Sequence, residues 1–248
     1  MNSLRRKIKI GSGISAVIVV GAGILGTATP ALATSPSTTN LLGANWRVWN
    51  AEPSTNFFWD INKAQSDGNG GIEFPIQTFE STSSGSFAVY LETNYNTSLA
   101  GTTITATANW DAGAYTTRST VFTGAYARAE FQDVSSGRYT SNDYWWYSGS
   151  VLDLNGATSG TITAPMSDRA NWTNVCGQVA TDTTPHPGPN CVGGTDPNVS
   201  PYDGFTNAMQ SVKQVNLAFG SAGSYASGVA TTNPDPATFD VSAFDITH

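Results

Sequence analysis

The chain has 248 residues, of which 12% are charged and 11% aromatic, and its formal net charge at pH 7 is −7. So many aromatic residues with so little charge are typical of a folded protein and exclude a disordered one. The acidic balance also excludes nucleic acid and anionic membrane surfaces as partners, because both are bound through basic residues.

The first 33 residues form a predicted signal peptide, and the protein is therefore expected to be secreted. Four basic residues precede an uncharged, mostly apolar run at 14–25, and Ala31-Leu32-Ala33 places small residues where signal peptidase cleaves. The apolar run is shorter than the roughly 18 residues that a membrane span needs, so we expect no membrane span after cleavage. A retained membrane anchor is the alternative.

The rest of the chain is predicted to form one domain. Residues 34–40 are rich in Ser, Thr and Pro and are expected to be a flexible leader. Residues 41–248 contain neither a fixed-period repeat nor an inter-domain linker, and their length suffices for one β-sandwich core.

Alternation of apolar and polar residues predicts the strands of an all-β, antiparallel sandwich. The alternating runs lie at 72–77, 87–92, 103–110, 127–132 and 214–219. Pro75 marks the first of them as an edge strand or a bulge. Short helical segments are predicted at 167–170 and 205–210.

The last predicted strand changes the parity of its apolar residues. Phe239 and Val241 have odd numbers, whereas Phe244 and Ile246 have even numbers. A β-bulge near Ser242-Ala243 would place all four side chains in the core.

The two cysteines, Cys176 and Cys191, are predicted to form a disulfide bond, because exported proteins fold in oxidising surroundings. The bond would close a loop of about 16 residues and stabilise the protein by about 3 kcal/mol in the chain-entropy model. Three prolines in this loop exclude a regular element there. The spacing of the cysteines and His186 does not match a zinc site.

Three segments of the C-terminal half carry a resemblance to a known fold. They are 144–154, 171–177 and 217–246, and the match extends over about residues 101–247. Together they resemble the jelly-roll, galactose-binding-like β-sandwiches of secreted bacterial proteins, a fold that many carbohydrate-binding modules have. The resemblance implies a single jelly roll and carries over no functional residue, since such sandwiches host many functions.

Consecutive aromatic residues suggest a platform for sugar rings. Neighbours in a strand point to opposite faces, so Trp145 and Trp146 cannot both enter one core, and the same parity argument separates Trp46 from Trp49. An exposed indole beside polar side chains suits a polysaccharide or other glycan. The predicted ligand-binding residues are Tyr144, Trp145, Trp146, Asn142, Asp143, Arg138 and Tyr139. The alternative is that the 176–191 loop or the N-terminal segment covers the outer tryptophan.

No catalytic motif is found, so the sequence predicts a non-enzymatic, carbohydrate-binding protein with no catalytic residues. Glu73, Glu92 and Glu130 lie on polar strand faces and could form a glycosidase-type pair, but a solvated strand face is the favoured interpretation. A serine triad would have to use His186 or His248, and neither lies in a predicted scaffold. The alternatives are a structural surface protein and, less favoured, a jelly-roll glycoside hydrolase or polysaccharide lyase with a carboxylate pair.

The segment 66–73 is a candidate calcium site. Asp67, Asn69 and Glu73 supply oxygen ligands at alternating positions, which hard cations prefer. The same Asp-Gly-Asn-Gly sequence is also ordinary turn chemistry. No other cofactor is predicted.

Overall fold

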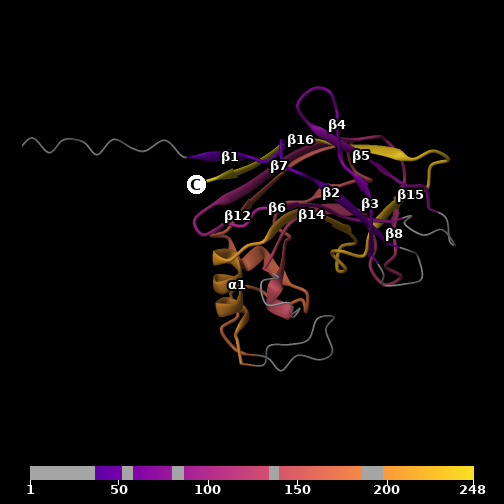
Figure 1. Cartoon of the computed structure of the whole chain (residues 1–248). Coiled ribbons are helices and arrows are strands. Elements are labelled where there is room, and N and C mark those ends of the chain that lie inside the picture. The colour runs from indigo at the N-terminus through magenta and orange to yellow at the C-terminus, as the bar shows by residue number, and fades with distance from the viewer. Residues whose placement is uncertain (1–36, 52–57, 80–86, 134–139, 186–197) are drawn as a thin grey trace, which may run out of the picture. The chain divides into compact units, whose positions relative to one another are not determined.

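The computed structural model describes residues 37–51, 58–79, 87–133, 140–185 and 198–248. Their strands form two antiparallel sheets that lie one above the other (Figure 1). The smaller sheet has the order β12 (Ser159–Pro165), β7 (Thr103–Trp110), β16 (Ala237–Thr247), β5 (Ile72–Ile76) and β4 (Gln65–Ser66), with β1 (Thr38–Asn40) paired to β16. The all-β prediction is thus confirmed, whereas the single jelly roll stays a prediction.

The larger sheet carries most of the C-terminal half of the chain. Its order is β13 (Trp172–Asn174), β10 (Tyr144–Tyr147), β9 (Tyr126–Gln132), β14 (Gln214–Gly220), β6 (Phe87–Asn94), β15 (Val229–Thr231) and β8 (Tyr115–Thr117). β11 (Leu152–Asp153) pairs with β9, and β2 (Arg47–Ala51) joins β6 to β3 (Phe58–Lys63). β6, β9 and β14 therefore lie at the centre of this sheet.

The core lies between the two sheets and is rich in aromatic rings. Phe74 and Phe239 of the smaller sheet pack against Phe219 of the larger one, with ring centroids 5.1–5.7 Å apart. A second cluster joins Phe131 and Trp145 to Phe205 of helix α1 (Pro201–Gln210). In the smaller sheet, β5 and β7 bury every second side chain, as the alternation predicts, whereas β9 and β14 of the larger sheet are buried on both faces.

The predicted bulge in the last strand is confirmed. The register of β16 against β7 shifts between Val241 and Ala243, and Phe239, Val241, Phe244 and Ile246 all have 0% exposed surface. One extra residue reverses the parity of the strand and so keeps both halves of its apolar pattern inside.

Several element boundaries differ from the prediction. Helix α1 begins at Pro201, four residues before the predicted segment, because Ser200 caps it by accepting the Asp203 N–H and proline is tolerated at the first helical position. The 3-10 helix η2 spans Arg169–Asn171, near the predicted turn. β1 lies within the segment predicted as a flexible leader. Pro75 pairs only with Thr238 of β16, beyond the end of β4, as its edge assignment requires.

Parts of the predicted organisation lie outside the described residues. These are the signal peptide at 1–33 and Cys191, so export and the Cys176–Cys191 disulfide stay predictions. No helix in the described part of the chain has the length and apolar character that a membrane span requires.

The β14–β15 loop (221–228) ends at a glycine that the fold requires. Gly228 has φ +85°, and a Cβ added there would lie 2.8 Å from the Cβ of Phe87. We expect Gly228→Ala to lower the free energy of unfolding by more than about 1 kcal/mol, measured by urea denaturation. Gly101→Ala is the matched control, because Gly101 has φ +73° but open space around it. An equal loss for both variants would show that the contact with Phe87 contributes nothing.

Candidate functional site

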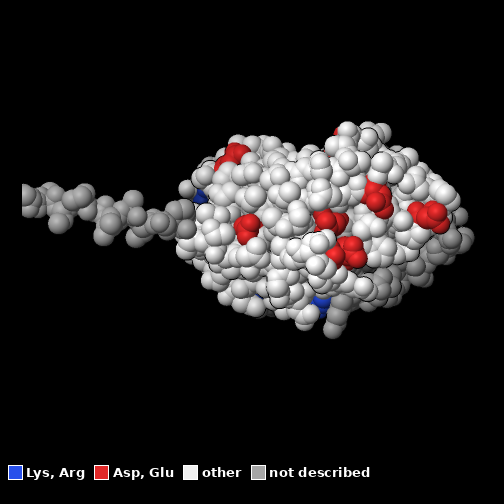
Figure 2. Space-filling view, turned by 90° about the horizontal axis from the view of Figure 1, so that it is seen from above, with Lys and Arg blue, Asp and Glu red and all other residues white. Residues whose placement is uncertain are grey.

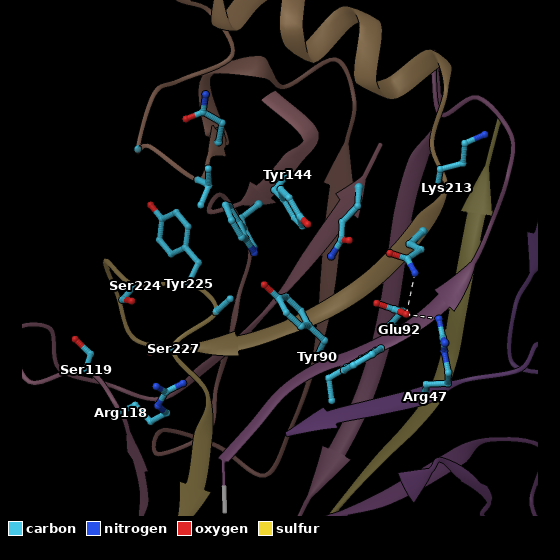
Figure 3. A pocket seen from close by; sticks show the side chains of 18 of the residues that line it. Arg47, Tyr90, Glu92, Arg118, Ser119, Tyr144, Lys213, Ser224, Tyr225 and Ser227 are labelled. Atoms are coloured by element: carbon cyan, nitrogen blue, oxygen red, sulfur yellow. Dashed lines mark hydrogen bonds and ion pairs between the residues drawn. The ribbon is translucent and has the colours of Figure 1, made fainter. Parts of the chain in front are cut away.

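A pocket of about 1060 Å³ lies on the face of the larger sheet that points away from the core. In β9 and β14 the odd-numbered residues enter the core, and so does Leu91 of β6. The residues between them, such as Tyr90, Glu92 and Arg128, are mostly long polar or aromatic residues on the opposite face. The β14–β15 loop and the segment after β8 add further lining residues, such as Tyr225 and Arg118 (Figure 3).

Five side chains from five neighbouring strands form what we call the central row. Arg47 of β2 lies opposite Glu92 of β6, Glu92 opposite Asn216 of β14, Asn216 opposite Glu130 of β9, and Glu130 opposite Trp146 of β10. Directly opposed residues share one face of a sheet, so the two glutamates lie on either side of one asparagine.

Glu92 is held as an ion at the edge of the pocket. Its Oε1 lies 2.6 Å from Nη2 of Arg47 and accepts a hydrogen bond of 2.8 Å from Nε2 of Gln214 (Figure 3). Only 5% of Glu92 is exposed, so this ion pair is strong by the standards of surface pairs. The arrangement keeps a negative charge fixed in position.

Glu130 differs from Glu92 in being fully buried and, among the described residues, in having no ion pair. It has 0% exposed surface, and its Oε1 accepts a hydrogen bond of 2.8 Å from Nε2 of Gln132. Burial raises the pKa of Glu130 to about 8, the Gln132 hydrogen bond opposes this, and the charge of Glu92 adds to it. Glu130 is therefore protonated at neutral pH, and since Oε1 accepts from Gln132, the proton belongs on Oε2.

The central row holds polar atoms whose bonding capacity the protein does not use. Within the described residues, Oε2 of Glu130, the side-chain amide of Asn216 and Nε1 of Trp146 are buried and form no hydrogen bond. The indole N–H of Trp146 and the amide of Asn216 lie close enough to Glu130 to lower its pKa, but their distances and angles do not meet the criteria for a hydrogen bond. Buried polar groups without partners each cost about 1–3 kcal/mol, so such a cluster is typical of a functional site.

Aromatic rings stand on either side of the glutamates. The ring of Trp146 stacks on Tyr144 at 6.3 Å and packs against Tyr225 at 6.0 Å. Tyr90 and Trp49 line the same pocket from β6 and β2. Rings of this kind present flat apolar surfaces beside hydrogen-bonding groups.

The structure separates the seven residues that the sequence grouped as a ligand site. Tyr144 and Trp146 line the pocket, whereas Trp145 lies in the core. Asn142 and Asp143 belong to η1 (Ser141–Asp143) and support the chain locally: the Asn142 carbonyl accepts the Trp145 indole N–H, and Oδ2 of Asp143 accepts the Thr140 N–H. Arg138 and Tyr139 lie outside the described residues.

The parity argument for the tryptophans is confirmed by their placement. Trp46 packs in the core against Phe244, and Trp49 lines the pocket. Trp146 is on the outer face but only 4% exposed, and the β14–β15 loop packs on it through Tyr225. Covering by a loop was the alternative that the sequence left open, although a different loop was expected.

The interpretation of the glutamates as a solvated strand face is wrong for two of the three. Glu92 and Glu130 are buried together on the larger sheet, because the aromatic rings and the β14–β15 loop cover that face. Glu73 lies on the smaller sheet, opposite Asp240, and has no part in the pocket.

The predicted calcium ligands are arranged as a turn. Oδ1 of Asp67 accepts the backbone N–H groups of Asn69 and Gly71, at 2.7 and 2.8 Å. No group of three or more His, Cys, Asp or Glu side chains suited to a metal is found among the described residues. Calcium binding by Asp67, Asn69 and Glu73 stays a prediction.

Sequence reasoning missed most of the pocket. The lining residues it did not single out include Arg47, Tyr90, Gln132, Gln214 and Tyr225, and it also missed Asn216 of the central row. One signal was available: β7 alternates its apolar residues with threonines, whereas β9 alternates them with Arg128, Glu130 and Gln132. This difference sets the outer face of β9 apart from that of β7, although charged and amide side chains are by themselves typical of an exposed face.

Comparisons with known proteins give a coarse likeness. No family model matches the chain, and no curated protein matches it. Among solved structures it resembles xylanase 10C of Cellvibrio japonicus in complex with xylopentaose, at 14% identity and a TM-score of 0.35, over 85% of this chain and 28% of that one. It also resembles LamA of Zobellia galactanivorans in complex with laminaritriose and laminaritetraose, at 9% identity and a TM-score of 0.37, over 87% of this chain and 99% of that one. This chain thus spans less than a third of the xylanase.

The prediction that this protein is not an enzyme is contradicted. The structures it resembles include a xylanase, and the outer face of the larger sheet brings together two glutamates in different environments. Because the TM-scores lie below 0.4, the function proposed below rests on the residues of the pocket.

Proposed function

We propose that the protein is a carbohydrate-active enzyme that binds a glycan chain in the pocket of the larger sheet and hydrolyses it with Glu92 and Glu130. The observation that carries this proposal is the central row, in which a fixed carboxylate and a protonated carboxyl lie on either side of Asn216.

Glycan binding is supported by the chemistry of the pocket lining. The ring faces of Tyr144, Trp146 and Tyr225 can take the C–H faces of sugar rings. The Gln214 and Asn216 amides and the indole N–H of Trp146 can bond to hydroxyl groups. A cavity of about 1060 Å³ accommodates an oligosaccharide rather than a single sugar.

Hydrolysis is supported by the contrast between the two glutamates. Glycosidases use one protonated carboxyl to give a proton to the leaving oxygen and a second, ionised carboxylate to act on the opposite face of the sugar. Environments that move two carboxyl pKa values apart produce this division of roles. Glu130 fits the acid, which donates its proton to the glycosidic oxygen, and Glu92 fits the base, which takes a proton from the attacking water.

The spacing of the strands favours inversion at the anomeric carbon. One strand separates β6 from β9, so the Cα atoms of Glu92 and Glu130 lie roughly 10 Å apart at the usual strand spacing. Both side chains rise from the same face of the sheet, so we expect their carboxyl groups to keep a separation of that order. Inverting enzymes need carboxyl groups about 6.5–9.5 Å apart, and retaining ones need about 5–5.5 Å. Because Glu130 has no exposed surface, a substrate reaches it only when Tyr225 and the β14–β15 loop move aside.

The test measures retention and cleavage together. The purified protein is applied to a panel of insoluble and soluble polysaccharides, and new reducing ends are then measured for each glycan that retains it. We expect at least one glycan to be retained and cleaved, with the α or β form of the first product opposite to that of the broken bond.

Variants assign the roles. Glu130→Gln and Glu92→Gln are expected to keep retention and to reduce cleavage by about a hundredfold or more, as loss of an acid or base does. Glu73→Gln, on the other sheet, is the matched control and should leave cleavage unchanged. Retention without cleavage on every glycan would contradict hydrolysis, and no retention on any glycan would contradict the proposal as a whole.

A further inference from the structure

Basic residues gather at the pocket of an otherwise acidic protein. Beyond residue 33 the chain has 7 Lys and Arg against 18 Asp and Glu. Arg47, Arg118 and Lys213 line the pocket, and among the described residues Glu92 is the one acidic residue in its lining. The face over the smaller sheet shows the opposite balance, with several separate acidic groups and few basic ones (Figure 2).

A fourth basic residue lies beneath the pocket lining. Arg128 of β9 shares the outer face of its strand with Glu130 and is only 3% exposed. Its guanidinium lies over the rings of Tyr225 and Tyr126, at 4.6 and 5.2 Å from their centroids. Within the described residues it forms no ion pair, and its Nε and Nη1 are buried without a hydrogen bond.

A buried guanidinium without a carboxylate partner is unusual. Arginine nitrogens are normally hydrogen-bonded when they are buried, because losing water around them is costly. Glu130 does not balance this charge, since burial raises its pKa to about 8 and leaves it neutral at pH 7. The positive charge of Arg128 therefore remains available to a bound anion once the Tyr225 ring moves.

The basic residues are spread along the pocket rather than clustered at one point. Arg118 lies on one side together with Ser119, Ser224 and Ser227, whereas Arg47 and Lys213 lie on the other side (Figure 3). Tyr90 and Tyr144 lie between the two groups, and Tyr225 lies on the Arg118 side (Figure 3). Lys213 forms no ion pair among the described residues. A chain crossing the aromatic rings would thus meet a cation at both ends.

We propose that the pocket takes an anionic glycan, whose sugar units carry carboxylate or sulfate groups that Arg118 and Lys213 bind at opposite ends of the pocket. This inference rests on the proposed function and narrows it to a substrate class. An anionic glycan carries charges at regular intervals along its length, so one chain can reach basic residues on both sides of the pocket. A neutral glycan would offer no anionic group to Lys213 or to Arg128, which form no ion pair among the described residues.

The test compares each anionic glycan with its own neutral form. Polygalacturonate, glucuronoxylan and alginate are immobilised beside their carboxyl-reduced forms, which keep the linkages but lose the charge. A sulfated galactan is immobilised beside its desulfated form. We expect retention on one charged member and at least tenfold weaker retention on its neutral partner, and which pair responds tells carboxylate from sulfate.

Variants and salt complete the design. Arg118→Gln and Lys213→Gln should each weaken retention on the charged glycan several-fold, and added salt should do the same. Arg169→Gln is the matched control, because it removes the same positive charge from a residue that packs against helix α1. Equal retention on charged and neutral forms would overturn the anionic preference while leaving the proposed function intact. Failure on every glycan, charged or neutral, would instead reject the proposed function.

Discussion

Replacing Glu130 with glutamine is expected to stabilise the protein by about 3 kcal/mol at pH 7. The carboxyl has a pKa of about 8 in the folded state, against 4.5 in the unfolded chain. Folding at pH 7 therefore takes up a proton, and the 2.5 pH units above 4.5 cost about 1.4 kcal/mol each. Glutamine keeps the shape and the acceptor for Gln132 without this penalty.

The sign of the pH dependence follows from the raised pKa. The contribution of Glu130 to the free energy of unfolding is fully present below pH 4.5 and is lost as the pH rises toward 8. Urea denaturation at pH 5 and pH 7 should therefore show the gap between Glu130→Gln and wild type widening with pH, to about 3 kcal/mol at the higher value. Glu73→Gln, which removes a carboxyl from the other sheet, serves as the control. A variant less stable than wild type at pH 7 would mean that Glu130 is ionised in the folded protein.

Substitutions of the two adjacent tryptophans in β10 are expected to have different effects, one on stability and the other on glycan binding. Trp145 has no exposed surface, packs against Phe205 at 5.1 Å and donates its indole N–H to the Asn142 carbonyl. Trp145→Ala should lower the free energy of unfolding by about 3–5 kcal/mol. Its folded fraction should bind the glycan as wild type does, because no atom of Trp145 lines the pocket.

Trp146→Ala should instead weaken glycan binding. Its ring lies between Tyr144 and Tyr225 in the pocket, so its loss removes a stacking surface and an N–H donor. We expect affinity for the retained glycan to fall at least about tenfold while the protein stays folded. Titration calorimetry at a temperature where both variants are folded, as judged by circular dichroism, measures the two effects separately. Equal affinity of Trp146→Ala and wild type would remove Trp146 from the site.

Local sequence patterns predicted the elements better than the site. The parity switch at Ser242-Ala243 predicted the bulge in β16, and the adjacent Trp145 and Trp146 predicted one core ring and one outer ring. Both arguments use residues within one strand, where alternation is fixed by backbone geometry. The placement of Glu92 and Glu130 on either side of Asn216 depends instead on the register of β6, β9 and β14, which lie far apart in the chain.

Burial of the glutamates depends on one further long-range contact. The β14–β15 loop places Tyr225 against Trp146, and no pattern within the loop itself shows where it will pack. The alternation of polar residues in β9 and β14 indicates a shared face but not its depth. The sequence alone therefore favoured a solvated face, whereas the folded chain buries a proton donor there.

The indole N–H signals of the protein, recorded by ¹⁵N NMR with and without the retained glycan, test the central claim most directly. Trp46, Trp110, Trp145 and Trp172 donate their indole N–H groups to backbone carbonyls. Trp49 and Trp146 line the pocket, and their N–H groups have no partner among the described residues. A glycan in the pocket should shift the Trp49 and Trp146 signals and leave the other four in place. If the bound glycan shifts neither the Trp49 nor the Trp146 signal, or shifts only those of the four hydrogen-bonded tryptophans, the assignment of this pocket as the glycan site is contradicted.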